Sequence, residues 1–170
     1  MPEFICNTSP FQYLHQIGHL DLLPALTRGV VVPPAVVEEL DAGRALGLDL
    51  PDLRSLGWVT LRTPASSPAL PLAADLGKGE SAVLALALES NDPLVILDDG
   101  LGRRVAELLR IPLTGTLGIL LDAKEARMIA ALNPMLDQLD SLRFRLSAAT
   151  RAAVLRLAGE HGEESITEGL

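Results

Sequence analysis

The sequence predicts an α/β fold, a three-layer α/β/α sandwich around a central and mainly parallel sheet. Short runs of β-branched and aliphatic residues alternate along the chain with longer segments of helical character. Strands that are separated by helices pair in parallel through right-handed crossovers. The hydrophobic fraction is 48% and the aromatic fraction only 3%, which suits aliphatic parallel strands that helices bury on both faces.

The elements of the N-terminal part alternate from the start. Residues 4–6 are β-rich and lead into Asn7-Thr8-Ser9-Pro10, where we expect Ser9 to cap a helix with Pro10 at its first position and Gly18 to end it. Asp21 is placed to cap a second, short helix that runs through Leu26. This part therefore predicts one strand followed by two helices.

A second strand and a third helix follow. Residues 30–32 are three valines, an unbroken β-branched run typical of a buried strand. The next helix starts at Pro34, and its Glu38 and Glu39 lie about 100° apart around the helix axis, so only one can face a given site. Residues 58–61 predict another strand.

The central part contains the clearest strand of the chain. A loop rich in Pro, Ser and Ala at 63–71 precedes Gly77-Lys78-Gly79-Glu80, which opens a helix over 81–89. The apolar strand 94–97 then ends abruptly in Asp98-Asp99-Gly100. Further elements are a helix over 101–109, a strand at 113–114, and helices that start at Leu117, Asn133 and Ser147.

The length of 170 residues indicates one domain with a substantial core. We expect this domain at residues 1–158 and a polar, acidic tail at 159–170. No apolar run approaches the roughly 18 residues that span a bilayer, and the N-terminus lacks the pattern of a secretion signal. We therefore expect a cytoplasmic location.

Polar residues follow two of the predicted strands directly. Ligand sites of parallel sheets lie at the carboxyl ends of strands, near the switch in strand order, which singles out Asn7 and the pair Asp98-Asp99. Adjacent carboxylates repel each other unless a cation or hydrogen-bond donors offset their charge, so the pair indicates a hard metal ion. An Asx turn or helix cap before Leu101 explains the same pair.

Other candidate ligands have simpler explanations as well. Glu80 at a helix start is also a favourable charge at the positive end of the helix dipole, and Glu38 and Glu39 also suit an exposed helix face. Gly77-Lys78-Gly79 lacks the spacing of a nucleotide-binding loop, so we interpret it as a hinge and helix cap.

Cysteine and histidine offer no metal site. Cys6 is the single cysteine, and His15, His19 and His161 lack metal-ligand spacing. Any metal must therefore bind to oxygen ligands.

The net charge of −8 is unevenly distributed. Residues 101–157 carry more basic than acidic side chains, and four of the basic ones are candidates for a phosphate-binding face. A solvated helix surface explains them equally well. These candidates are Arg103, Arg104, Lys124 and Arg127.

Five segments in order resemble the PIN domain family, over about residues 3–158. The segments are ICNTSP, VVVPPAVVEEL, GKGESAVLALALE, LVILDDGLGRRVA and IPLTGTLGILL. The resemblance implies a ribonuclease that depends on Mg²⁺ or Mn²⁺ and uses clustered acidic residues. Many such proteins are VapC-type prokaryotic toxins that a small antitoxin protein restrains, and they commonly form homodimers.

Carried over by position, the resemblance places metal ligands at five residues of this chain. The first family acid falls on Asn7 and the fourth on Asp98 or Asp99, with Asp99 favoured. Supporting hydroxyl groups fall on Thr8, Ser9 and Thr116. The implied catalytic residues are Glu39, Glu80, Asp98 and Asp99, and the implied metal ligands are these four and Asn7.

Asn7 departs from the family pattern, which has an acid at this position. An amide oxygen carries no formal charge and binds Mg²⁺ more weakly than a carboxylate. The alternative function is therefore a weakly active or inactive PIN-like module that binds nucleic acid or regulates a partner. A phosphatase of the haloacid dehalogenase type would need an Asp-x-Asp pair after the first strand, where Asn7-Thr8-Ser9 supplies no carboxylate.

Leucine-rich helices at 11–26 and 117–132 are candidates for a homodimer interface. Covering the central sheet explains their apolar residues equally well.

Overall fold

The computed structural model describes residues 1–160. Two compact units divide the chain, Met1–Ile119 and the part from Leu120 onward. The first unit contains the whole sheet. Most of the predicted tail, with His161, lies outside the described residues, and within these no helix is long and apolar enough to cross a membrane.

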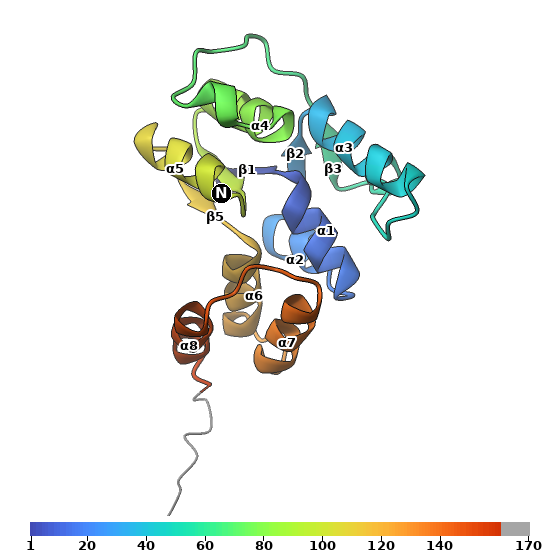
Figure 1. Cartoon of the computed structure of the whole chain (residues 1–170), viewed down its shortest axis with the longest axis vertical. Coiled ribbons are helices and arrows are strands. Elements are labelled where there is room, and N and C mark those ends of the chain that lie inside the picture. Colours follow the sequence, from blue (N-terminus) through green and yellow to red (C-terminus); the bar gives the residue numbers. More distant parts are fainter. Residues whose placement is uncertain (161–170) are drawn as a thin grey trace, which may run out of the picture. The chain divides into compact units, whose positions relative to one another are not determined.

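The sheet has five strands in the order β3-β2-β1-β4-β5, and all neighbouring strands pair in parallel (Figure 1). The strands are β1 (Glu3–Cys6), β2 (Val30–Val32), β3 (Val59–Leu61), β4 (Pro93–Ile96) and β5 (Leu113–Thr114). Together with the helices, this sheet confirms the predicted three-layer α/β/α class. The strand order switches direction at β1 and β4, which lie side by side.

Eight helices accompany the sheet within the described residues. They are α1 (Thr8–Gln16), α2 (Leu22–Thr27), α3 (Pro34–Ala45), α4 (Lys78–Glu89), α5 (Gly100–Leu108), α6 (Thr116–Glu125), α7 (Asn133–Ser141) and α8 (Ala148–Leu157). In the first unit, α2 contacts β2, α4 contacts β1 and β4, and α5 contacts β5. Short 3-10 turns at Leu53–Ser55 and Ala73–Asp75 interrupt the loops.

The core of the first unit forms around the two central strands. Ile5 of β1 and Val95 and Ile96 of β4 are fully buried, as expected for strands covered on both faces. Phe11 of α1 is buried too and stacks on Trp58 beside β3, with ring centroids 6.2 Å apart. The two central strands therefore lie in the middle of this core.

The start of α1 differs from the prediction. The helix begins at Thr8 with Asn7 as its N-cap residue, rather than at Pro10 with Ser9 as the cap. The Asn7 side chain makes no capping bond because its amide group bonds elsewhere. The predicted cap at Ser9 was therefore wrong, whereas Gly18 follows the helix end with a φ of +77°.

In the second unit, Glu160 makes polar contacts with three other residues. Its carboxylate accepts hydrogen bonds from the backbone N–H groups of Leu132 and Asn133, 2.8 and 3.3 Å away. Lys124 of α6 forms an ion pair with it at 3.2 Å. Glu160, which the sequence assigned to the tail, thus links the chain after α8 to the start of α7.

Candidate metal centre

Asn7 and the pair Asp98-Asp99 follow two adjacent strands, as the sequence predicted from their positions. Cys6 at the end of β1 pairs with Ile96 at the end of β4, and the Asn7 backbone N–H donates to the Ile96 carbonyl at 3.0 Å. The residues beyond both strand ends therefore start from the same edge of the sheet.

The Asn7 side chain is fully buried and its two polar atoms have different surroundings. Its amide nitrogen Nδ2 donates to Oε1 of Glu80 at 3.0 Å. Its oxygen Oδ1 is buried without any hydrogen-bond partner in the part of the chain that the structure describes. Buried polar atoms are almost always satisfied, so this oxygen is available to accept a bond from an added ligand.

Glu39 lies on the other side of the same space. Its Oε2 accepts a hydrogen bond of 2.5 Å from the Thr8 hydroxyl, and its Oε1 accepts one of 3.0 Å from the backbone N–H of Gly79. A Cβ atom on Gly79 would lie 2.8 Å from both Glu39 oxygens and 3.0 Å from Oδ1 of Asn7. These three oxygens therefore surround a space that only glycine leaves open.

Asp99 lies at the start of α5, next to the residues around Gly79. Its Oδ2 accepts a hydrogen bond of 2.7 Å from the backbone N–H of Gly102. A Cβ atom on Gly102 would lie 3.3 Å from this oxygen and 3.4 Å from Cγ of Glu80. Asp99 is thus both the cap of α5 and a neighbour of Glu80.

Asp98 points to a different set of partners. The backbone N–H of Thr116 donates to its Oδ1 at 2.8 Å, and the Thr116 hydroxyl donates to its Oδ2 at 2.6 Å. Burial raises the pKa of this carboxyl group, against the lowering effects of the Thr116 hydrogen bonds and the Arg103 charge. Both oxygens of Asp98 are engaged, so Asp98 is positioned to shape this end of the crevice.

The candidate metal ligands of this centre are all oxygen atoms. Within residues 1–160, no three His, Cys, Asp or Glu side chains form a group that could hold a metal ion by themselves. The unpartnered Oδ1 of Asn7 supplies a further oxygen between Glu39 and Glu80, and amide and carboxylate oxygens are the ligands of hard cations. The roles assigned to the four acids stay predictions.

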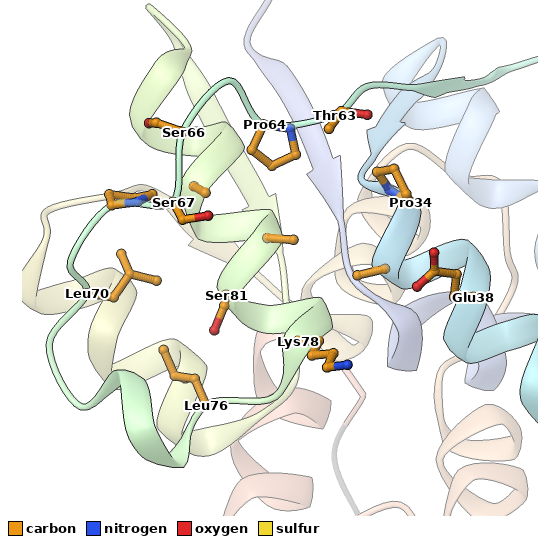
Figure 2. A pocket seen from close by; sticks show the side chains of 14 residues that line it. Pro34, Glu38, Thr63, Pro64, Ser66, Ser67, Leu70, Leu76, Lys78 and Ser81 are labelled. Carbon is orange, nitrogen blue, oxygen red and sulfur yellow. The ribbon is translucent and has the colours of Figure 1, made fainter.

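Glu38 faces away from this centre. Its carboxylate lines a separate pocket with Lys78 (Figure 2), whereas the carboxylate of the neighbouring Glu39 contacts Thr8 and Gly79. The helical spacing of the two residues produces this difference.

The four predicted nucleic-acid-binding residues have different environments. Arg103 donates to the Leu97 carbonyl at 2.9 Å and lies beside Asp98, and Arg104 is exposed on the same helix. In the second unit, Lys124 is bound to Glu160 and to the Ala130 carbonyl, and Arg127 is exposed. Their role in binding RNA stays a prediction.

Two contributions to the site were not identified from the sequence. Gly79, interpreted as part of a hinge, supplies the backbone donor to Glu39, and its place directly before Glu80 was the available signal. Arg103 braces the end of β4. Of the supporting hydroxyls, Thr8 and Thr116 bond to acids, whereas the Ser9 hydroxyl has no hydrogen bond to the described residues.

Comparison with known families finds a match over most of the chain. Residues 3–160 match the profile of a family described as the PIN domain. No curated protein matches the chain. The matched residues span all the strands and helices described above.

Proposed function

This chain belongs to the PIN domain family, and from that premise we propose that it is an endoribonuclease that hydrolyses RNA with the help of Mg²⁺ or Mn²⁺. PIN domains are typically nucleases and generally use divalent metal ions. The single observation that supports the proposal is the buried, unpartnered Oδ1 of Asn7, which lies with the Glu39 oxygens around Gly79.

Each residue of the centre has a proposed part. Asn7, Glu39, Glu80 and Asp99 would hold the cation. When bound, a divalent cation supplies positive charge beside the phosphodiester and makes water a better nucleophile. Thr8 and the Gly79 N–H fix the Glu39 carboxylate, and the Asn7 amide fixes Glu80. This preorganisation keeps the acids in place before substrate arrives.

Asp98 and Arg103 would act as positioning residues for the turn that carries Asp99. Thr116 holds Asp98 through two hydrogen bonds, and Arg103 bonds the carbonyl of Leu97. The turn between β4 and α5 is therefore fixed, which keeps Asp99 beside Glu80. No side-chain nucleophile is required by this scheme.

A non-catalytic PIN-like module is the second candidate function. Asn7 favours it, because an uncharged ligand at the centre binds Mg²⁺ more weakly than a carboxylate. In that case the domain binds nucleic acid or a partner protein without turnover.

Cleavage of a mixed RNA substrate across an Mn²⁺ and Mg²⁺ titration distinguishes the two functions. We expect cleavage by the wild type that disappears in Asp99→Asn, since asparagine keeps the helix cap of α5 and removes only the charge. Asp137→Asn on α7, remote from the proposed ligands in sequence, is the matched control and should retain activity. No cleavage by the wild type at saturating metal would reject the nuclease assignment.

The finer biological role is proposed from the family resemblance alone. We propose that the chain acts as the toxin of a toxin–antitoxin pair. A small gene directly upstream that encodes a DNA-binding protein would support this role, and co-purification of its product with the chain would test it.

A further inference from the structure

A second cavity lies beside the candidate metal centre. Its volume is about 480 Å³, within the roughly 300–1,000 Å³ of small-molecule sites. Its walls are α4, the first turns of α3 and the segment of residues 62–77, which we call the arch (Figure 2). All of these elements belong to the first unit.

The arch is hydrogen-bonded to α4, the helix beside which it runs. Glu89 at the end of α4 accepts hydrogen bonds from the backbone N–H groups of Ala65 and Ser66, 2.7 and 3.2 Å away. At its other end the arch continues directly into α4. Both ends of the cavity wall are therefore fixed by the same helix.

The lining combines apolar surface with unused hydroxyl groups. Leu70 and Leu76 of the arch supply apolar wall. Thr63, Ser67 and Ser81 also line the cavity, and their hydroxyls make no hydrogen bond to residues 1–160. A ligand with an apolar face and several polar edge atoms suits such a lining.

Lys78 and Glu38 bring charge to one end of the cavity, where α4 and α3 approach each other (Figure 2). Lys78 is exposed and forms no ion pair with any described residue. It also occupies the first position of α4, where the helix dipole favours an anion. Lys78 and the start of α4 therefore offer positive charge to a phosphate group at this end, beside the negative charge of Glu38.

The cavity and the metal centre share three pairs of sequence neighbours. Glu38, Lys78 and Ser81 line the cavity. The residues next to them, Glu39, Gly79 and Glu80, form the centre. The two sites are therefore carried by neighbouring residues of the same two helices, α3 and α4.

We propose that this cavity is a nucleoside subsite, which holds the base and sugar of the RNA nucleotide next to the cleaved phosphodiester while Lys78 contacts a phosphate. This inference rests on the proposed ribonuclease function. The flat base would pack on the apolar wall, and the hydroxyls would bond its edge atoms and the ribose 2′-hydroxyl, as single-stranded RNA is generally recognised.

Binding is tested without metal, so that no cleavage is needed. Uridine and adenosine 5′-monophosphates are titrated into the ¹⁵N-labelled chain, and amide shifts are followed by NMR. We expect changes at Thr63, Ser67 and Ser81. Lys78→Ala should weaken binding of the monophosphates about tenfold while leaving uridine itself unaffected, because only the monophosphates present the anion.

A variant with a side chain that fills the cavity provides the second test. Ala82 lines the cavity, so Ala82→Phe should abolish the shifts and raise KM for RNA about tenfold with little change in kcat. Ala152→Phe on the exposed side of α8 is the matched control. Absent shifts at millimolar nucleotide, or shifts confined to other residues, would overturn the subsite.

The two tests also separate this inference from the nuclease proposal. If the wild type cleaves RNA and Ala82→Phe cleaves it with unchanged KM, the subsite is wrong and the nuclease assignment stands. If nucleotides bind at the arch and no RNA is cleaved, the nucleotide site stands and the nuclease assignment fails.

Discussion

The Asn7 amide lies between the carboxylates of Glu80 and Glu39 and presents a different atom to each. Its nitrogen donates to Glu80, which steadies that acid without any cation, and its oxygen faces the space beside Glu39. A carboxylate at position 7 could not donate to Glu80. The asparagine thus adds no charge to the repulsion between the carboxylates when no cation is bound, and it also lowers the negative charge available to a metal.

Asn7→Asp should tighten Mn²⁺ binding on the order of tenfold, because the added negative charge strengthens the attraction for a hard cation. The same variant should melt at a lower temperature than the wild type in EDTA, since it loses a hydrogen bond and gains like-charge repulsion. Calorimetric titration and thermal melting measure the two effects. Unchanged Mn²⁺ affinity would remove Asn7 from the ligand set.

Gly79→Ala should weaken metal binding with a small effect on stability. The added Cβ would lie 2.8 Å from both Glu39 oxygens, a distance that forces the flexible Glu39 side chain to move. We expect the Mn²⁺ affinity to fall at least about tenfold, while the metal-free melting temperature changes little. Gly57→Ala is the matched control because a Cβ there meets no atom within 4 Å.

At the scale of elements, the sequence predicted the order of strands and helices because periodicity and end signals are local. Three valines gave β2, and the strand before Asp98 was equally clear. The positions of Asn7 and Asp98 beyond strand ends followed from the general rule for parallel sheets. These features need only neighbouring residues and a topology.

The parts that the sequence could not predict depend on side chains far apart in the chain. Asn7 and Glu80 are 73 residues apart and Thr8 and Glu39 are 31 apart. Their hydrogen bonds form only after the sheet brings them together, and they take Asn7 away from its local capping role. The separation of Asp98 from Asp99 likewise depends on Thr116.

Glu160→Gln tests the link that joins the helices of the second unit. Burial raises the pKa of Glu160, but its bonds to Leu132, Asn133 and Lys124 outweigh that effect and lower the pKa below 4.5. The charged form is thus favoured on folding, so its stabilisation is present at neutral pH and is lost as the pH falls through the lowered pKa.

We expect Glu160→Gln to lower the free energy of unfolding at pH 7 by about 1 kcal/mol. For a chain of this size, the melting temperature should fall by about 2–4 °C. The difference from the wild type should shrink as the pH is lowered below 4.5. Glu107→Gln on the exposed side of α5 is the control. A pH-independent difference would show that charge is not what links the helices.

At the scale of the whole molecule, the candidate centre lies entirely in the first of the two units. A ligand at ten times its dissociation constant adds about 1.4 kcal/mol to the free energy of unfolding. Mn²⁺ should therefore raise the melting temperature of this unit by about 3–6 °C. If calorimetry resolves two transitions, only one should move. Glu80→Gln should remove the shift, Glu38→Gln should keep it, and a shift of both transitions would contradict the location.

Self-association is the other whole-molecule prediction. The apolar residues of the segment 11–26 are mostly turned inward, and the large exposed hydrophobic residues of the described chain include none from it. Segment 117–132, the other candidate, contributes Met128, which is 44% exposed. A homodimer through these two segments would therefore use little apolar surface, and we expect a weak one that forms with rising concentration. Sedimentation between micromolar and millimolar concentrations measures it. A monomer mass throughout would exclude the dimer.

The arch also divides the proposed metal-binding residues of the chain into two groups. Asn7, Thr8 and Glu39 come before it, and Gly79 and Glu80 come after it. Most of its residues are exposed, and exposed loops are where proteases cut and where chains tolerate a break. A single cut there leaves two fragments, each with part of the ligand set, so activity after proteolysis would depend on whether β1 and β4 of separate fragments stay paired.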